Sequence, residues 1–370
     1  MPRLTVVQLL PALESGGVER STLEIAQALV AAGHRALVVS AGGRLVPKLR
    51  ALGAEHIQLD IGRKSLLTLR HARTLRALFA RERVDLVHAR SRLPAWLAVL
   101  ALRGMPAAAK PRFVTTVHGL NSPSRYSAVM TRGERVICVS DTVREYVLRH
   151  YPTTDPVRLR VIPRGIDTGM FPRMPHPDAE ARAWAATQHP ALAGSAPLLL
   201  LPGRGTRLKG HADALQLLAR LRAQGIAARL WLPGAREAGR EAYIAELERE
   251  AAALGIADAI AFTPPTDQIT RAYAASDLVL QLSRKPESFG RTVIEALSVG
   301  RPVLGWAHGG VGELLADLQP GGGVPPFDLD ALARKAGELL AQPPTPPATI
   351  PYTLHAMQES TLAVYAELCG

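Results

Sequence analysis

Two glutamates, Glu287 and Glu295, are spaced so that one should lie in a loop and the other in the helix that follows. The apolar run at 278–282 indicates a buried strand before them. In open α/β sheets, ligands bind in the crevice at the carboxyl ends of the strands. Carboxylates there could accept hydrogen bonds from a polyol, and Gly290 would let the backbone N–H groups of the helix start face an anion. Both glutamates could equally be solvated charges, and these residues alone leave that choice open.

A basic, glycine-rich turn at 203–211 follows another apolar run at 198–201. Its Arg204 and Lys209 could donate charge-assisted hydrogen bonds to a diphosphate. The Gly-Lys-Ser/Thr of a Walker A loop is missing, so ATP hydrolysis is not expected. The alternative is that both side chains are simply solvated.

Glycines and histidines stand at other strand ends. Gly16-Gly17 lies where the first strand should turn into the first helix, so that backbone donors could approach a phosphate or sugar. The Gly-x-Gly-x-x-Gly fingerprint is absent there, which argues against an NAD enzyme. His118 follows a predicted strand at 113–117, and His88 is placed similarly. Either histidine could serve the site or be a satisfied structural residue.

No metal centre is expected from the residue types. No Asp-x-Asp follows a predicted strand, the cysteines and histidines lack the spacing of metal ligands, and Gly-x-Ser-x-Gly is absent. Positively charged side chains would then have to stabilise a departing phosphate without the help of a metal ion. We therefore predict neither a metal nor another cofactor.

Strands and helices are predicted to alternate in two successive sets. The first set has strands near 5–10, 36–40, 84–88, 113–117 and 135–139, and the second near 198–201, 228–232, 259–262, 278–282 and 302–306. This alternation predicts an α/β fold of two Rossmann-like, doubly wound parallel sheets facing a cleft. We expect one domain at 1–168, a second at 169–345, and a last helix within 346–370 that crosses back to the first domain.

Charge is distributed unevenly along the 370 residues. The net charge is +12, but residues 1–175 hold 27 Lys and Arg against 12 Asp and Glu, whereas the rest is nearly neutral. An anionic substrate or membrane surface would meet the first half. The two cysteines form no disulfide framework, which favours a reducing cytoplasm.

The segment 65–80 is predicted to be one amphipathic helix. Its leucines alternate with arginines, and further basic residues flank it at both ends. Such a helix could lie on a membrane surface. It could also pack its apolar side against the sheet, and the pattern does not separate the two.

These residues resemble the retaining glycosyltransferases of family 4, which share the two-domain GT-B fold. The resemblance covers nearly the whole chain and depends on Gly16-Gly17, Val117-His118-Gly119, Arg164-Gly165-Ile166-Asp167, Gly203-Arg204 with Lys209-Gly210, and Glu287 with Glu295. Glu287-Ser288-Phe289-Gly290 followed by Glu295-Ala296 is its most specific part. Within the family, the chain is similar to a bacterial branch that assembles the lipopolysaccharide core.

The resemblance implies that 1–168 is the acceptor-binding domain and 169–345 the nucleotide-sugar-binding domain. Arg204 and Lys209 would bind the diphosphate and neutralise the leaving group, and Glu295 would accept hydrogen bonds from the ribose hydroxyls. The backbone of three consecutive residues would hold the sugar or phosphate: Phe289, Gly290 and Arg291.

The resemblance also implies the reacting groups. Glu287 would contact hydroxyls of the donor sugar, His118 would lie beside that sugar, and Gly17 would face the donor phosphates and the acceptor. The anomeric configuration would be retained by front-side attack, in which the departing phosphate takes the acceptor proton. Two departures matter: Arg164 replaces an Asn found in many members, and Thr263-Pro264-Pro265 replaces a Gly near the nucleobase.

The resulting hypothesis is a cytoplasmic glycosyltransferase that uses a nucleotide sugar, with uridine as the expected nucleoside. Its acceptor would be an anionic glycolipid or oligosaccharide, such as a lipopolysaccharide-core precursor at the inner membrane. One alternative is a nucleotide-sugar 2-epimerase of the same architecture. Another is a basic nucleic-acid-binding protein, but no aromatic stacking platform accompanies the basic residues, so we expect no nucleic acid.

Overall fold

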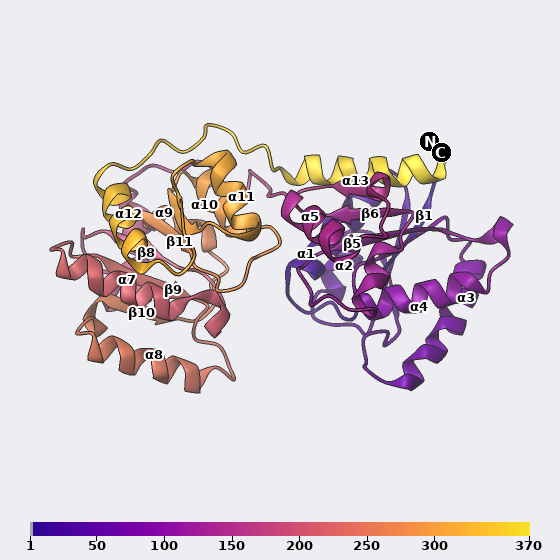
Figure 1. The fold of residues 1–370 in the computed structure, drawn as a ribbon, viewed down its shortest axis with the longest axis horizontal. Coiled ribbons are helices and arrows are strands. Elements are labelled where there is room, and N and C mark those ends of the chain that lie inside the picture. Colours follow the sequence, from indigo (N-terminus) through magenta and orange to yellow (C-terminus); the bar gives the residue numbers. More distant parts are fainter. Residues whose placement is uncertain (1–2) are drawn as a thin grey trace. The chain divides into compact units, whose positions relative to one another are not determined.

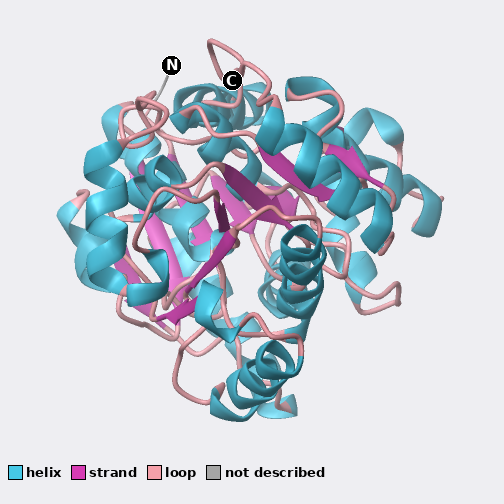
Figure 2. Cartoon of the chain, turned by 90° about the vertical axis from the view of Figure 1, so that its left-hand side faces the viewer, coloured by secondary structure: helices cyan, strands magenta, loops and turns pink. Residues whose placement is uncertain are grey.

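A computed structural model describes residues 3–370 and divides them into two compact units (Figure 1). The first unit comprises residues 3–164 and 354–370, and the second comprises residues 165–353. Each unit contains a parallel β-sheet, and helices cover the strands (Figure 2). The predicted α/β fold of two Rossmann-like parallel sheets is confirmed.

The first unit has seven parallel strands in the order β3-β2-β1-β4-β5-β6-β7. The strands are β1 (Thr5–Leu9), β2 (Arg35–Ser40), β3 (Glu55–Gln58), β4 (Leu86–Ala89), β5 (Arg112–Val117), β6 (Arg135–Cys138) and β7 (Leu159–Val161). The helices are α1 (Gly17–Ala31), α2 (Val46–Ala51), α3 (His71–Arg81), α4 (Arg92–Arg103), α5 (Asp141–His150) and α13 (Leu354–Cys369). The winding reverses between β1 and β4, so the switch point of this sheet lies at their carboxyl ends.

The second unit has six parallel strands in the order β10-β9-β8-β11-β12-β13. The strands are β8 (Leu198–Leu200), β9 (Arg229–Pro233), β10 (Ile260–Thr263), β11 (Leu278–Gln281), β12 (Val303–Trp306) and β13 (Gly323–Val324). The helices are α6 (Ala179–Gln188), α7 (His211–Ala223), α8 (Glu241–Ala253), α9 (Ile269–Ala275), α10 (Arg291–Val299), α11 (Gly309–Leu318) and α12 (Leu329–Ala341). Here the winding reverses between β8 and β11.

Three strands were not predicted from the sequence, and all three lie at sheet edges. They are β3, β7 and β13. An edge strand is paired on one side only, so it does not need the continuous apolar run that marks a buried strand. β3 has a polar sequence with no buried residue, and β13 has only two residues. The apolar-run criterion therefore found the central strands and missed these edges.

The last helix, α13, completes the core of the first unit. Its Met357, Val364 and Tyr365 are buried, and Gln358 donates a hydrogen bond to the carbonyl oxygen of Glu24 on α1 (2.8 Å). The Tyr365 hydroxyl lies 2.6 Å from Nδ1 of His88.

His88 is enclosed at the end of β4. Its Nε2 lies 2.6 Å from the Thr116 hydroxyl, and burial lowers the pKa of His88 well below its ordinary value. With both ring nitrogens bonded to neighbouring side chains and no exposed surface, His88 is a satisfied structural residue.

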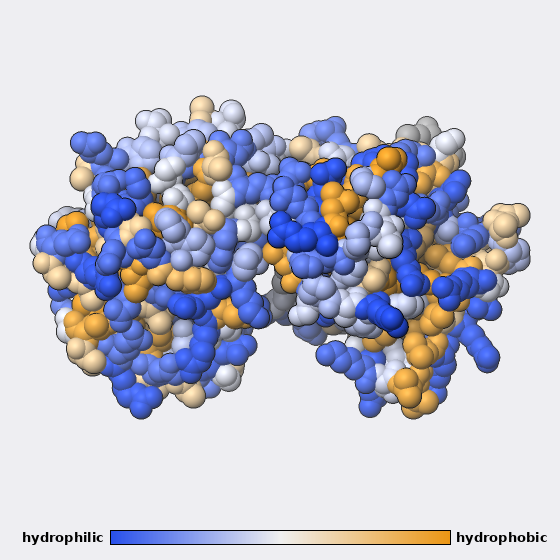
Figure 3. Space-filling view, viewed as in Figure 1, coloured by the Kyte–Doolittle hydropathy of each residue, from blue (hydrophilic) through white to orange (hydrophobic). Residues whose placement is uncertain are grey.

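The predicted amphipathic helix at 65–80 is two elements. A 3-10 turn, η1 (Leu66–Arg70), precedes α3, whose Leu75, Leu78 and Phe79 are buried. The leucines of η1 are instead exposed: 86% for Leu66, 68% for Leu67 and 42% for Leu69. Figure 3 shows hydrophobic surface mixed with hydrophilic surface on this side of the first unit. Within residues 3–370, no helix has the length and apolar character needed to cross a membrane.

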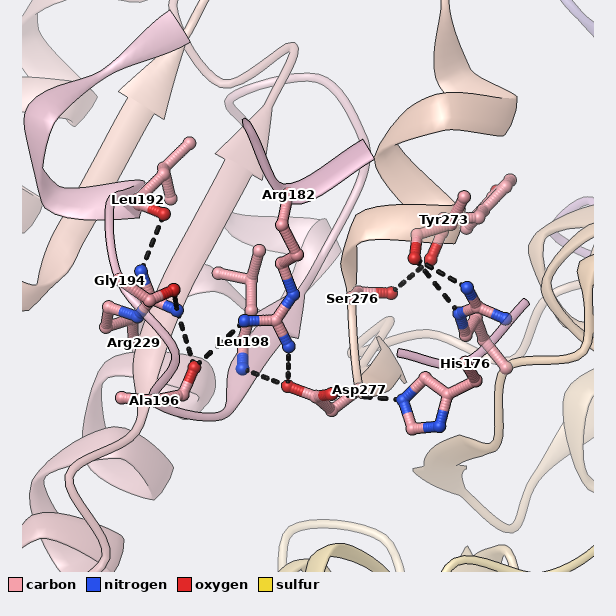
Figure 4. Close-up of polar contacts among 12 residues, drawn as sticks. His176, Arg182, Leu192, Gly194, Ala196, Leu198, Arg229, Tyr273, Ser276 and Asp277 are labelled. Carbon is pink, nitrogen blue, oxygen red and sulfur yellow. Dashed lines mark hydrogen bonds and ion pairs between the residues drawn. The ribbon is translucent and has the colours of Figure 1, made fainter. Parts of the chain in front are cut away.

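The charged side chains of Arg229 and Asp277 hold the loop before β8 in contact with the second sheet (Figure 4). Arg229, the first residue of β9, donates to the carbonyl oxygens of Leu192, Ala193, Gly194 and Ala196. Asp277, just before β11, accepts from the backbone N–H of Leu198 (2.6 Å), from Arg182 and from His176 (3.0 Å). These contacts replace hydrogen bonds to water that the two Nη atoms of Arg229 and the carboxylate of Asp277 lose on burial.

We expect Asp277→Ala to lower the free energy of unfolding by about 3 kcal/mol, because it leaves the largely buried guanidinium of Arg182 without its carboxylate. Denaturant unfolding followed by circular dichroism measures this change. Asp258→Ala is the control, since Asp258 is 74% exposed in its side chain and lies 3.6 Å from Arg222. Its loss should cost about 0–1 kcal/mol. Equal effects of the two substitutions would contradict the role given to Asp277.

Candidate active site

The switch point of the second sheet brings two loops together. The loop after β8 ends in the 3-10 turn η6 (Arg207–Lys209), and the loop after β11 carries Glu287. Nζ of Lys209 lies 2.7 Å from Oε1 of Glu287. Two predicted site residues that are 78 positions apart in sequence are therefore in direct contact.

Gly210 makes this approach possible. It is the N-cap residue of α7 and has a φ of 77°, and a Cβ at this position would lie 2.0 Å from the carbonyl oxygen of Leu282. The start of α7 thus passes against the end of β11 with no room for a side chain. This close passage fixes Lys209 beside the loop of Glu287.

Glu287 is held by more than Lys209. The Ser283 hydroxyl donates to Oε1 (2.5 Å), and Gln281 Nε2 lies 3.4 Å from Oε2. Burial alone would raise the pKa of Glu287, but Lys209, Ser283 and the nearby His308 outweigh burial and keep that pKa below its ordinary value. Glu287 is therefore an ionised, oriented acceptor at neutral pH.

The loop between Glu287 and α10 is fixed by glycines. Gly290 is the N-cap residue of α10 and has a φ of 109°. The backbone N–H of Gly310 donates to the carbonyl oxygen of Glu287 (2.8 Å). A Cβ on Gly310 would lie 2.5 Å from Cα of Phe289. Phe289 is buried, so its side chain is not available to a ligand. Gly290 and Arg291 place backbone N–H groups at the first turn of this nine-residue helix.

Glu295 lies one turn further along α10 and is 8% exposed. The Tyr273 hydroxyl, on α9, donates to its Oε2 (2.9 Å). This buried tyrosine fixes the direction of the carboxylate. Glu295 therefore has a single orientation, as an acceptor for ligand hydroxyl groups requires.

Arg204 is exposed, and among residues 3–370 no acidic side chain pairs with it. Its basic neighbours differ, because Arg207 pairs with Glu246 and Arg284 pairs with Asp213. Arg204 is thus a cation that remains available to an incoming anion.

The other predicted site residues belong to the first unit. Gly16 and Gly17 are exposed at the start of α1, a helix of 15 residues. A Cβ at Gly17 would meet no atom within 4 Å, so packing within this unit does not explain the glycine. His118 follows β5, and its Nδ1 lies 2.7 Å from Nη2 of Arg164.

Several partners of the site residues were missed by the sequence analysis. They are Gln281, Ser283, His308 and Tyr273. Gln281 and Ser283 could have been noticed as polar residues at the end of an otherwise apolar strand. Tyr273 has no such signal, because its contact with Glu295 depends on how α9 packs on α10.

In the described part of the chain, no group of three or more His, Cys, Asp or Glu side chains is arranged to hold a metal ion. The arrangement at the second switch point instead offers cations, oriented carboxylates and helix N–H groups. These groups suit an anion that also carries hydroxyl groups.

We predict that Lys209→Met lowers the free energy of unfolding by about 1 kcal/mol at neutral pH, since it leaves the half-buried Glu287 carboxylate, 25% exposed, without its cation. The folded-state pKa of Glu287 is lowered, so the stability that this pair contributes is present above the ordinary value of 4.5 and is lost as pH falls through the folded value. The difference between the two proteins should therefore shrink in acid. Denaturant unfolding over a series of pH values measures it, and a difference independent of pH would contradict the assignment.

Comparison with known proteins identifies the family. The profile described as Glycosyltransferase Family 4 matches residues 15–169, and the profile described as Glycosyl transferases group 1 matches residues 184–354. Together these ranges span most of the chain.

Among curated proteins, the chain is 33% identical over 217 residues to the D-inositol 3-phosphate glycosyltransferase of Xylanimonas cellulosilytica. That alignment covers 56% of this chain and 50% of the relative. The chain spans about half the length of the curated relatives that it matches.

Two solved structures share the fold over nearly the full chain. A glycosyltransferase from Rickettsia africae aligns with a TM-score of 0.86 and 26% identity, over 100% of this chain and 99% of its own. HepE from Anabaena, solved in complex with UDP, aligns with a TM-score of 0.75 and 20% identity, over 98% and 95%. With a glycosyltransferase profile matched over each half and this shared fold, the chain belongs to Glycosyltransferase Family 4 and has the GT-B fold.

Proposed function

We propose that this glycosyltransferase moves a hexose from a uridine-diphosphate sugar to an anionic glycolipid or oligosaccharide, with retention of the anomeric configuration. The pairing of Lys209 with Glu287 carries the proposal. It places a cation that can bind phosphate beside a carboxylate that can bind sugar hydroxyls, at the switch point of the second sheet. The UDP bound by HepE supports uridine as the nucleoside.

The donor would be held by the groups around this pair. Arg204 and Lys209 bind the diphosphate, and the N–H groups at the start of α10 add further donors. Glu295, oriented by Tyr273, accepts hydrogen bonds from the ribose. In this proposal the two cations neutralise the leaving diphosphate, with no metal ion and no other cofactor.

Glu287 would orient the sugar rather than attack it. Its Oε1 already accepts from Lys209 and Ser283, which favours a fixed acceptor over a nucleophile. The acceptor oxygen forms its bond to the anomeric carbon on the face from which the phosphate leaves. The bond to the phosphate oxygen breaks, and that oxygen takes the acceptor proton. Retention then needs no covalent intermediate with the protein.

The acceptor side of the proposal depends on charge. Residues 1–175 hold 27 Lys and Arg against 12 Asp and Glu, which favours a phosphorylated acceptor. A lipopolysaccharide-core precursor has this chemistry, and so does inositol phosphate, which the name of the Xylanimonas relative contains. We propose the core precursor, assembled at the cytoplasmic face of the inner membrane, and treat the inositol phosphate as the competing acceptor.

Nucleotide release across a panel of UDP-, GDP- and ADP-sugars, with and without acceptor, tests the proposal. We expect one UDP-sugar to be used and truncated core glycolipid to stimulate release. Preference for another nucleoside would overturn the uridine assignment. Nucleotide release that is stimulated by inositol 3-phosphate and not by the core glycolipid would overturn the proposed acceptor.

In the same assay, Arg204→Ala and Lys209→Ala should each lower turnover by about 10²-fold, as loss of a donor to the leaving charge does. Arg207→Ala is the matched control from the same loop, since Arg207 pairs with exposed Glu246 and should leave turnover near the wild-type value. Unchanged turnover in both Arg204→Ala and Lys209→Ala would refute the phosphate assignment. Arg204 is exposed, so its replacement should not disturb folding.

Membrane contact through the first unit is part of the proposal. The η1 patch, defined as Leu66, Leu67 and Leu69 with Arg63, Lys64 and Arg70, combines exposed leucines with basic residues. No acidic residue occurs between positions 61 and 81. Exposed apolar side chains flanked by cations suit an anionic leaflet, where each basic residue contributes about 1 kcal/mol.

We expect the protein to sediment with phosphatidylglycerol vesicles at low salt and to remain free with phosphatidylcholine vesicles. Replacing Leu66 and Leu67 by Ser should reduce the bound fraction several-fold, because the apolar anchor is lost. Val157→Ser is the control, since Val157 in the same unit has the same 68% exposure as Leu67. Equal binding by the wild type and the double variant would exclude the η1 patch as the contact.

A further inference from the structure

The contact between Arg164 and His118 limits what the histidine can do. Nη2 of Arg164 lies 2.7 Å from Nδ1 of His118. A guanidinium group has five N–H donors and no acceptor, so Nδ1 must be the accepting nitrogen. In the neutral ring the proton is then on Nε2.

Arg164 is itself held from two further elements. Its Nη1 donates to the Ser21 hydroxyl on α1 (2.9 Å) and lies 3.6 Å from the sulfur of Met357 on α13. Arg164 is 8% exposed, and Ser21 and Met357 are also buried. The guanidinium therefore has one position, and so does the ring that receives its hydrogen bond.

A second buried arginine adds to the constraint. Arg90, 2% exposed, donates from Nη1 to the same Ser21 hydroxyl (3.1 Å) and from Nε to Gln8 (2.7 Å). Two cations thus approach one oxygen atom. Protonating His118 on Nδ1 would add a third positive charge to this cluster and set two donors face to face.

His88 shows the contrast within the same unit. Its two ring nitrogens face the hydroxyl groups of Tyr365 and Thr116, which can each donate or accept. Neither tautomer of His88 is imposed by its partners. The partner of His118 imposes one.

We propose that Arg164 is a positioning residue that keeps His118 neutral with its proton on Nε2. His118 then carries a hydrogen-bond donor at Nε2 and cannot accept a proton as a general base there. The assignment deepens the proposed function, because it concerns the side chain expected beside the donor sugar. The tautomer itself can be observed without any turnover.

The experiment uses the 370-residue chain labelled with ¹⁵N-histidine. Long-range ¹H–¹⁵N correlation spectra distinguish a protonated ring nitrogen from an unprotonated one, and the spectrum of His118→Gln identifies the signals of His118 among the 11 histidines. At neutral pH we expect protonated Nε2 and unprotonated Nδ1 in the wild type. Protonated Nδ1, or a doubly protonated ring, would overturn the proposal.

Variants separate positioning from folding. Arg164→Met should mix the two tautomers and lower turnover by about 10-fold or more, whereas Arg164→Lys, which keeps a donor, should restore part of the Nε2–H form. Arg90→Met is the matched control, because it removes a buried arginine from the same serine and leaves the contact at Nδ1. An unchanged tautomer in folded Arg164→Met would overturn the proposal. If Arg164→Met does not fold, the wild-type spectrum decides.

The two proposals fail separately. Absence of nucleotide release from every sugar would remove the proposed function and leave the spectrum of His118 readable. A wrong tautomer with normal use of a UDP-sugar would remove only the role of Arg164.

Discussion

The candidate site depends on one ion pair, between Lys209 and Glu287. Each partner lies on a loop that leaves the sheet at its switch point. Because Gly210 has no side chain, the backbones of the two loops can come into contact. Without the cation, burial would favour a neutral Glu287, and without the carboxylate, Lys209 would lose its position. The pair therefore keeps both groups charged and in place before any ligand arrives. Such preorganisation spares the reaction the cost of rearranging charges.

The charged side chains in the interior of the two units have different hydrogen-bond partners. In the second unit, Arg229 donates to carbonyl oxygens and Asp277 accepts from a backbone N–H group and from Arg182, and these contacts hold the loop before β8. In the first unit, Arg90 and Arg164 share the neutral hydroxyl of Ser21. Two cations that approach one hydroxyl group repel each other, which adds to the cost of burying them. Both arginines lie at the carboxyl end of the first sheet, just after β4 and a few residues after β7, where ligands bind in folds of this kind.

The sequence allowed the fold class and the family to be predicted, and it missed what depends on packing. Strict apolar runs identified the central strands, whereas the polar strand β3 and the two-residue strand β13 had no such signal. The segment 65–80 was predicted as one helix, because periodicity does not show where a 3-10 turn replaces the α-helix. Arg164 was noticed only as a departure from Asn. Its contact with His118 joins residues 46 positions apart, which no local pattern reveals.

The position of α13 has a consequence for biosynthesis. The first unit is built from residues 3–164 and 354–370, so its core lacks Met357, Val364 and Tyr365 while the ribosome is still translating the continuous second unit. Until then His88 has no tyrosine hydroxyl beside it, and the apolar side of α1 stays uncovered. During synthesis, residues 354–370 are made after the whole of the second unit, so the first unit cannot complete its core until that later segment is available. Until α13 is made, the apolar surface of the first unit that it covers is exposed to chaperones.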